Sequence, residues 1–382
     1  AKDKDLKTPN VPPLRFPGFS DEWVKVSLGD IGETLIGLTY SPKDVVANDG
    51  TIVFRSSNIQ DGMIDYTDLV RVNKPIKERI VTRENDILIC ARNGSQRLIG
   101  KNALLTKADE GNTFGAFMMI YRSDDNDVIH PILSTRRYIS QVSENLGARI
   151  NQITTSDLNS FEFYIPSNCI ERRKIGKLFA LINERIATQN KIIDNLQSLI
   201  KGLRERIFAP MLSNLIKLGA IANITNGSGD VQDAISKYAD DLYPFFDRSE
   251  DMKYFSSFGF DAEAIIYAGE GSEFLPRYYN GKFALHQRCY AITNFNKDYI
   301  PRFVYHFLST QNNYFIRKAV GSTVPSLRMD TFQNIGIPIV DKTLQSYVSN
   351  RLDTSCRLYD YEKQILSLYR NQKDYLLQNL FI

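Results

Sequence analysis

Two long segments of the chain carry apolar side chains at helical spacing. Residues 168–208 contain two glycines and no proline, and residues 343–382 contain neither. In the first segment the apolar positions alternate in steps of three and four residues, interrupted by Gln189, which is the heptad pattern of a coiled coil. The second has a broader stripe, interrupted by Lys373. At about 1.5 Å per residue, each segment predicts a helical rod of about 60 Å.

The predicted seam of the coiled coil consists of Ile186, Ile193, Leu196, Ile200, Leu203 and Ile207 in the first helix and Leu352, Tyr359, Leu366, Tyr369, Leu376 and Leu380 in the second. A leucine-rich stripe is more often an ordinary core face than a coiled coil. Two such helices in equivalent places favour the coiled coil, because the products of a duplication would pair antiparallel. We therefore expect the two helices to act as a spacer.

The chain also repeats shorter motifs. Before the first helix, Phe161, Phe163 and Ile165 alternate with polar residues as in a half-buried strand, and a similar run returns 174 residues later as residues 335–339. Likewise, residues 28–31 (Leu-Gly-Asp-Ile) return as residues 218–221 (Leu-Gly-Ala-Ile). Such self-similarity is the mark of an internal repeat.

Weaker parallels link residues 53–57 with 245–249, and Gly100-Lys101 with Gly281-Lys282. The predicted fold class is α+β: two similar α/β domains separated by two long antiparallel helices that form a coiled coil, with an internal pseudo-twofold repeat. The predicted boundaries are 1–167 for the first domain, 168–210 for the first helix, 211–342 for the second domain and 343–382 for the second helix.

Composition narrows the class of protein. Hydrophobic residues make up 43% of the chain and charged residues 24%, which are values of an ordinary globular protein. The four cysteines lie far apart with no C-x-x-C motif, so we expect reduced, buried thiols rather than a zinc site or a disulfide framework. Residues 1–10 are polar, and no run of 18 apolar residues occurs, so we expect a cytoplasmic protein without a membrane span.

Positive charge is concentrated in two regions, although the net charge is only +3. Residues 71–107 hold nine basic and three acidic side chains, and residues 271–328 hold eight basic and two acidic ones. A solvated surface would explain either region alone. Two basic regions in comparable places of a repeat favour a polyanion as the ligand.

The residue types in these regions suit the reading of DNA. Arg, Asn and Gln have forked polar groups that pair with guanine or adenine edges in the major groove, and several stand in glycine-containing loops such as residues 91–97. The candidate DNA-binding residues are Arg55, Ser57, Asn58, Arg92, Asn93, Ser95, Gln96, Arg97, Lys101, Arg248, Arg277, Tyr278, Tyr279, Lys282, His286, Gln287, Arg288 and Arg328. Which of them contact bases and which contact phosphates stays open.

No catalytic motif accompanies these loops. The stretch from Gly94 to Gly100-Lys101 has the wrong glycine spacing for a phosphate loop, and Asn102 stands where Ser or Thr is needed. The three histidines lack metal-binding spacing, so we predict no metal site and no catalytic residue. Two alternatives remain: a nuclease or methyltransferase fused to recognition domains, and a coiled-coil scaffold whose basic loops bind another acidic partner.

The chain resembles the specificity subunits of type I restriction-modification systems. The resemblance rests on residues 13–19 (Pro-Leu-Arg-Phe-Pro-Gly-Phe) with Trp23, on residues 28–31, and on the two apolar strands that lead through Pro166 or Pro338 into a long polar helix. The chain departs from the commoner family pattern where each long helix begins: Gln345 stands where a Glu-Gln pair often occurs, and Glu171-Arg172 replaces that pair in the first helix.

The resemblance implies a non-catalytic subunit that reads a bipartite double-stranded DNA target, one half-site per recognition domain, with the helices fixing the gap. It also implies partners: two methyltransferase (modification) subunits and the endonuclease/translocase (restriction) subunits. The assembly would be an adenine-specific methyltransferase and ATP-dependent endonuclease. S-adenosylmethionine, ATP and Mg are expected on those partners, and no cofactor is expected in this chain.

Overall fold

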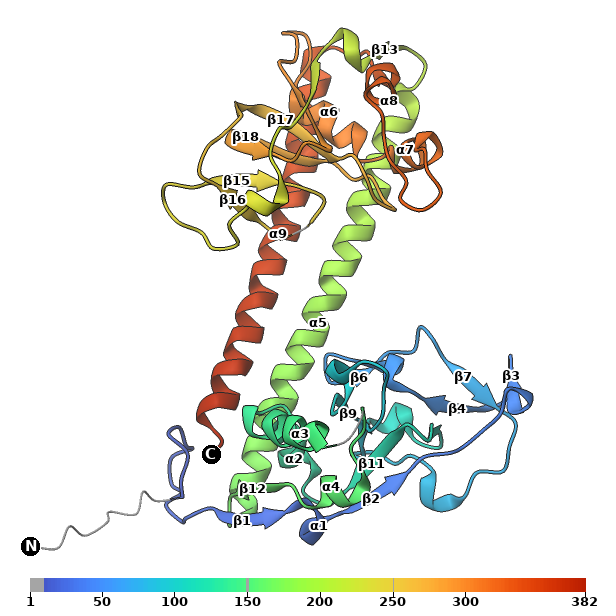
Figure 1. Cartoon of the computed structure of the whole chain (residues 1–382), viewed down its shortest axis with the longest axis vertical. Coiled ribbons are helices and arrows are strands. Elements are labelled where there is room, and N and C mark those ends of the chain that lie inside the picture. Colours follow the sequence, from blue (N-terminus) through green and yellow to red (C-terminus); the bar gives the residue numbers. More distant parts are fainter. Residues whose placement is uncertain (1–9, 149–150, 250) are drawn as a thin grey trace, which may run out of the picture. The chain divides into compact units, whose positions relative to one another are not determined.

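The computed structural model describes residues 10–148, 151–249 and 251–382, so residues 1–9 of the predicted first domain lie outside the described residues. The chain forms two compact units. Unit 1 contains Ala1–Thr188 and Ile365–Ile382, and unit 2 contains Gln189–Gln364. Figure 1 shows the elements of each unit. Among the described residues, no helix is both long and apolar enough to cross a bilayer.

Unit 1 is built on short sheets covered by helices. Two four-stranded sheets have the orders β10-β4-β7-β3 and β2-β11-β8-β9, and β1 pairs with β12 and β5 with β6. The strands are β1 Val24–Ser27, β2 Glu33–Ile36, β3 Val45–Val46, β4 Thr51–Phe54, β5 Ile59–Gln60, β6 Met63–Ile64, β7 Val70–Val72, β8 Ile87–Cys90, β9 Asn102–Leu104, β10 Thr113–Phe114, β11 Met118–Arg122 and β12 Glu162–Ile165. The helices are α1 Leu28–Ile31, α2 Asn126–Ile132, α3 Arg136–Ala148, α4 Thr155–Asn159 and the first part of α5 Cys169–Phe208.

Unit 2 has a larger, continuous sheet. Its six strands have the order β14-β19-β17-β18-β15-β16, and β13 pairs with β20. The strands are β13 Leu215–Lys217, β14 Asn223–Asn226, β15 Tyr243–Phe246, β16 Lys253–Phe255, β17 Phe260–Ala268, β18 Arg277–Leu285, β19 Cys289–Thr293 and β20 Gly336–Pro338. The helices are α6 Pro301–Leu308, α7 Asn312–Lys318, α8 Met329–Asn334, the last part of α5 and the first part of α9 Lys342–Asn379, whose last part belongs to unit 1.

The long helices α5 and α9 begin at side-chain caps. The Asn168 carboxamide oxygen accepts a hydrogen bond from Ile170 N (2.8 Å), and the Asp341 carboxylate accepts one from Leu344 N (2.9 Å). Such caps satisfy amides that have no partner inside a helix. The predicted ranges, 168–210 and 343–382, treat each helix as a separate segment. In the structure each helix is divided between the two units.

Each unit takes one end of both long helices into its core. In unit 1, Phe179 of α5 stacks on Phe381, with ring centroids 5.6 Å apart. In unit 2, Gln189 donates a hydrogen bond to the backbone oxygen of Glu362 (3.1 Å) and Arg204 donates one to Cys356 Sγ (3.3 Å). Within unit 2, residues further along α5 therefore contact residues earlier in α9, so these two segments are antiparallel.

The predicted seam positions are buried or half-buried. Ile186, Ile193, Ile200, Leu352 and Leu380 are buried, and Leu196, Leu203, Ile207, Tyr359, Leu366, Tyr369 and Leu376 are half-buried. Gln189, the polar interruption, is buried as well. The predicted seam positions are therefore at least partly covered by protein, as a coiled-coil stripe requires. A role of these residues as a spacer stays a prediction.

The repeat is visible in matching contacts of the two units. Leu28 N donates to Phe161 O (3.0 Å) in unit 1, and Leu218 N donates to Ile335 O (2.9 Å) in unit 2. In both units the strand before this contact pairs antiparallel with the strand that leads into a long helix, β1 with β12 and β13 with β20. These contacts join the segments that the sequence motifs matched.

Two sequence-based expectations are corrected. The parallel of Gly100-Lys101 with Gly281-Lys282 is wrong, because Gly100 and Lys101 precede β9 whereas Gly281 and Lys282 lie inside the nine-residue strand β18. All four cysteines are free, but only Cys90 and Cys289 are buried, and Cys169 is exposed. Burial raises the pKa of both buried thiols to about 11, so these two remain protonated at neutral pH.

Candidate nucleic-acid interface

Unit 1 has a hollow of about 890 Å³ where three loops meet. The loops follow β4, β8 and β10, and the segment after β2 also lines the hollow. We call this hollow 1. It is lined by Leu38, Thr39, Tyr40, Arg55, Ser56, Ser57, Arg92, Asn93, Gly94, Gly115, Ala116, Phe117, Met118 and Asn151.

Unit 2 has a hollow of about 810 Å³, which we call hollow 2. Its loops follow β15, β17 and β18. It is lined by Val231, Asp247, Arg248, Ser249, Lys253, Gly269, Glu270, His286, Gln287, Arg288 and Cys289.

The same backbone hydrogen bonds hold both hollows. In unit 1 they run from Gly115 N to Phe54 O (3.0 Å), from Ala91 N to Phe117 O (3.0 Å) and from Ile153 N to Ala91 O (2.9 Å). In unit 2 they run from His286 N to Phe246 O (2.9 Å), from Gly269 N to Arg288 O (2.9 Å) and from Leu327 N to Gly269 O (2.7 Å). The two hollows are therefore built on one backbone frame that occurs twice.

A glycine at the edge of each hollow allows this close packing. A Cβ atom on Gly37 would lie 2.3 Å from Gly115 O, and one on Gly227 would lie 2.0 Å from Leu285 O. Both distances are far below van der Waals contact, so no larger residue fits without displacing the loop. These two glycines lie 190 positions apart, which is the same offset as that between residues 28–31 and residues 218–221.

The side chains on this frame differ in charge. Hollow 1 has two cations, Arg55 and Arg92, and the Arg55 guanidinium is held by Asp68 (2.8 Å). Hollow 2 has two carboxylates, each paired with a cation: Asp247 with Lys253 (2.6 Å) and Glu270 with Arg288 (2.6 Å). The exposed Arg248 adds a further positive charge there. Both hollows thus carry an excess of positive charge, which favours an anionic ligand.

The structure brings only some of the predicted residues together. Arg55, Ser57, Arg92 and Asn93 line hollow 1, and Arg248, His286, Gln287 and Arg288 line hollow 2. Gln96, Arg97 and Lys101 line a separate pocket of about 650 Å³ in unit 1, together with Arg370 and Lys373 of α9. Ser95, Lys282 and Arg328 are exposed but line neither hollow.

Some predicted residues instead support the loops. Asn58 is fully buried and donates to the carbonyl oxygens of Asp65 and Asp68, so it stabilises the loop after β4 and has no surface for DNA. Arg277 donates to the backbone oxygens of Asp247 and Ser249 and thereby holds the loop after β15. The assignment of Asn58 as a DNA-contacting side chain is therefore wrong, whereas that of Arg277, which is half-buried, stays a prediction.

The two predicted tyrosines of β18 are half-buried in ring clusters. Tyr278 donates to Glu263, and the Arg302 guanidinium lies 3.8 Å from the centroid of its ring. Tyr279 packs against Phe246 and Phe283. The rings of both tyrosines and the hydroxyl of Tyr278 therefore make contacts within unit 2.

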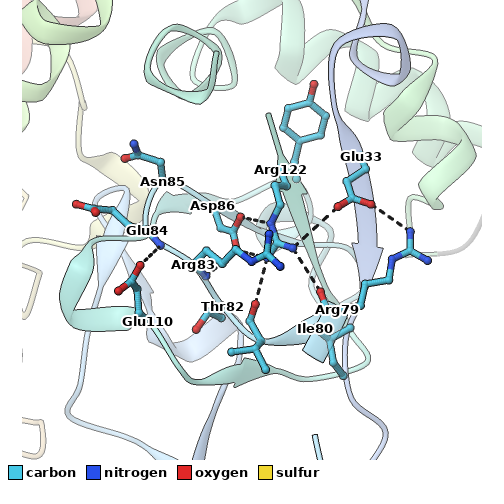
Figure 2. Close-up of polar contacts among 12 residues, drawn as sticks. Glu33, Arg79, Ile80, Thr82, Arg83, Glu84, Asn85, Asp86, Glu110 and Arg122 are labelled. Carbon is cyan, nitrogen blue, oxygen red and sulfur yellow. Dashed lines mark hydrogen bonds and ion pairs between the residues drawn. The ribbon is translucent and has the colours of Figure 1, made fainter. Parts of the chain in front are cut away.

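Part of the predicted basic region 71–107 does not line hollow 1, and three of its cations pair with carboxylates: Lys74 with Asp44, Arg79 with Glu33 and Lys107 with Glu110. Figure 2 shows the Arg122 guanidinium held by the buried Asp86, with Nε and Nη2 each 2.7 Å from a carboxylate oxygen. Next to it, Arg79 pairs with Glu33 (3.2 Å). A count of basic residues in the sequence therefore overstates the charge that faces a ligand.

Sequence reasoning missed several residues of the hollows, among them Phe117 and Glu270. Phe117 is 60% exposed, and the Arg92 guanidinium lies 5.3 Å from the centroid of its ring. Glu270 pairs with Arg288 from a neighbouring loop. No sequence signal marks either residue, because each contact joins loops 18 or more positions apart. Among the described residues, no three His, Cys, Asp or Glu side chains lie close enough to hold a metal ion.

Comparison with known families identifies the fold. The family model of the type I restriction modification DNA specificity domain matches residues 20–198 and again residues 212–368. The chain belongs to this family. Two matches in one chain agree with the two units and confirm the predicted family and fold class. The first match covers hollow 1 and the second covers hollow 2.

Curated relatives of this specificity family match part of the chain. The specificity subunit of the type I restriction enzyme EcoDI from Escherichia coli is 30% identical over 139 residues, which are 36% of this chain and 30% of the relative. The StySPI specificity subunit from Salmonella potsdam is 28% identical over 204 residues, which are 51% of this chain and 43% of the relative. The matched regions thus span less than half of the length of these relatives.

Solved structures match the fold over nearly the whole chain. The type I restriction-modification S subunit from M. genitalium has a TM-score of 0.66 at 16% identity, and the match covers 97% of this chain and 99% of that one. A chain from a study of the assembly of a type I system has a TM-score of 0.51 at 14% identity, with 96% and 98% covered. At such low identity the match supports the fold.

Proposed function

We propose that this chain is the non-catalytic subunit that selects the DNA target of a type I restriction-modification complex. Each unit reads one half of a bipartite sequence, and the long helices set the gap between the halves. The observation that carries the proposal is the repeated frame: two hollows with the same backbone hydrogen bonds and different polar side chains. A duplicated reader with altered side chains is what recognition of two different half-sites requires.

The chemistry of the hollows supports DNA as the ligand. Arginine and glutamine side chains stand exposed around an excess of positive charge, and these groups pair with base edges in the major groove. Each half-site would contribute about 1 to 3 kcal/mol of discrimination per well-read base pair. Positive charge near the hollows would add affinity that falls with rising salt.

The long helices offer surfaces for partner subunits. In unit 1, Ile365, Leu368 and Tyr375 of α9 are 36%, 64% and 59% exposed, and in unit 2, Leu358 and Tyr361 are 47% and 61% exposed. Large apolar side chains exposed on a helix mark interaction sites when they gather on one surface. We propose that two methyltransferase subunits dock on the helices and supply S-adenosylmethionine, and that endonuclease subunits, with ATP and Mg, join them in the cytoplasm.

The test is co-expression of the chain with a type I methyltransferase subunit, followed by genome-wide mapping of methylated adenines. The expected result is one motif of two specific parts separated by a fixed number of unread bases. Methylation without a bipartite motif contradicts the proposal, as does methylation by the purified chain alone. A chain that binds another acidic partner instead would show no salt-dependent DNA binding, and charge reversal at Arg92 and Arg288 would not change its affinity for DNA.

The spacer role has its own test. Seven residues are inserted after Gln189 in α5 and after Glu362 in α9, at positions that are in contact in unit 2. Seven residues preserve the heptad phase of both helices. The expected motif keeps both half-sites and changes only the gap, and an unchanged gap contradicts the spacer role.

A further inference from the structure

Each hollow has a pair of side chains at two equivalent backbone positions. Arg92 and Glu270 are equivalent because the backbone of each forms an isolated antiparallel β-bridge. Arg92 pairs in this way with Gln152, and Glu270 with Ser326. Phe117 and Arg288 are equivalent because the carbonyl oxygen of each accepts a hydrogen bond from the first residue after a strand. Ala91 N, after β8, donates to Phe117 O (3.0 Å), and Gly269 N, after β17, donates to Arg288 O (2.9 Å). The pair is thus Arg92 with Phe117 in hollow 1 and Glu270 with Arg288 in hollow 2.

We propose that these two pairs determine specificity at the centre of each half-site: the pair of hollow 1 reads a guanine and the thymine next to it, and the pair of hollow 2 reads one G·C base pair. The proposal rests on the proposed function. In hollow 1, Arg92 donates to guanine O6 and N7, and the Phe117 ring contacts the adjacent thymine methyl group. In hollow 2, Arg288 donates to guanine O6 and N7, and Glu270 accepts from N4 of the paired cytosine.

The backbone of each pair is rigid, and its side chains are accessible. Phe117 O accepts hydrogen bonds from both Ala91 N and Arg92 N, each at 3.0 Å. The Phe117 side chain is 60% exposed, and the Arg288 side chain is 65% exposed. Because the backbone is already held, binding does not have to order the loop, and only the side chains lose conformational freedom.

The free hydrogen-bonding groups of each pair match a base edge. Among the described residues, the Arg92 guanidinium has no hydrogen-bonded partner and lies over the Phe117 ring, so its donors remain available and its plane is held. In hollow 2, the contact between Arg288 Nη1 and Glu270 Oε1 leaves Nη2 and Oε2 available. The donors of Arg288 match the acceptors O6 and N7 of guanine, and the free carboxylate oxygen of Glu270 matches the N4 amino group of the paired cytosine.

An exposed phenylalanine beside a cation has no evident structural purpose in hollow 1. Its carbonyl oxygen accepts the backbone hydrogen bonds of the frame, and its ring lies beside the Arg92 guanidinium. Unit 2 has the same frame with an arginine at this position, so the frame does not need an aromatic ring there. The ring therefore serves the ligand, and apolar contact with a thymine methyl group is the readout available to it.

The test exchanges the pairs. The double variant R92E/F117R gives hollow 1 the pair of hollow 2, and E270R/R288F makes the reverse exchange. Each is co-expressed with the methyltransferase subunit, and methylated adenines are mapped. The expected result is a change confined to one half-site in each variant: R92E/F117R loses the preference for the thymine next to the guanine, and E270R/R288F gains such a preference, with the other half-site and the gap unchanged. An unchanged motif overturns the proposal.

Single lysine variants keep the test decisive where a double variant does not methylate. R92K and R288K preserve charge but lose bidentate geometry. Each is expected to reduce the preference for guanine at its base pair by roughly tenfold to a hundredfold in competition binding, with little change in affinity for unrelated DNA. R136K, at an exposed arginine of unit 1 outside the hollow, is the matched control. Full retention of guanine preference by both lysine variants overturns the proposal, and a bipartite motif in the unaltered protein shows that the proposed function stands regardless.

Discussion

The buried histidine of unit 1 predicts a specific loss of stability in acid. His130 lies in α2 and is 5% exposed, and its Nε2 has no hydrogen-bond partner among the described residues. Burial, followed by the positive charge of Lys373, lowers the pKa of His130 to about 3. Unfolding returns this side chain to water, where its pKa is about 6.5.

The sign and size of the effect follow from these two pKa values. Between about pH 6.5 and about pH 3 the unfolded state binds a proton at His130 that the folded state does not bind. Stability is therefore fully present above the unfolded pKa and is lost as the pH falls. From about pH 7.5 to about pH 5, His130 alone should reduce the free energy of unfolding by about 2 kcal/mol.

Urea unfolding at the two pH values measures this loss. Trp23 is the only tryptophan of the chain and lies in the same core as the neighbouring Ile129, so its fluorescence reports on unit 1. The variant His130→Gln removes the titrating ring, and the difference between the two proteins isolates its contribution. The second buried histidine, His306, is present in both proteins and cancels. Equal pH dependence in both proteins would refute the reasoning, because it would mean that the folded protein accepts the proton at His130.

Four further substitutions have defined outcomes. Gly37→Ala places a Cβ atom 2.3 Å from a carbonyl oxygen and should lower the thermal midpoint by several degrees, whereas Gly202→Ala, in an open helical position, should stabilise by about 0.5 to 1 kcal/mol. Asp86→Asn leaves the guanidinium of Arg122 half-paired, and denaturant titration should show a loss of about 3 to 5 kcal/mol. Thr154→Ala removes the cap of α4 and should cost about 1 kcal/mol by the same titration, and a loss near zero would mean that this helix end does not contribute to unit 1.

The long helices were predictable because their signal is local. Heptad spacing and the lack of breakers extend over 40 residues of α5, and the helix begins and ends within two residues of the predicted range. The repeat could also be predicted in places where a close backbone contact requires a glycine in both halves, as at Gly37 and Gly227. The division of both helices between the units was not predictable, because it depends on which core each helix end enters.

The hollows were only partly predictable. Arginines at the ends of strands could be recognised as candidate ligands, and Arg92 and Arg288 do line hollows. Periodicity could not show that Arg277 donates to a loop 28 residues away. It also could not show that Glu270 and Arg288 form a pair, since that contact depends on the register of β17 with β19.

The two hollows explain why bulk charge is a poor guide to this protein. Its acidic residues are used inside the recognition units: Asp86 and Asp247 are buried and hold cations, and Glu270 orients an exposed arginine. A buried carboxylate that fixes a guanidinium or a loop makes the site more selective while it lowers the net charge of the chain. A net charge of +3 is therefore consistent with a DNA-binding protein, provided that selectivity comes from ordered pairs of side chains and not from the amount of positive charge. The repeated frame carries these pairs through backbone contacts alone, so their side chains can differ between the units without a change of fold.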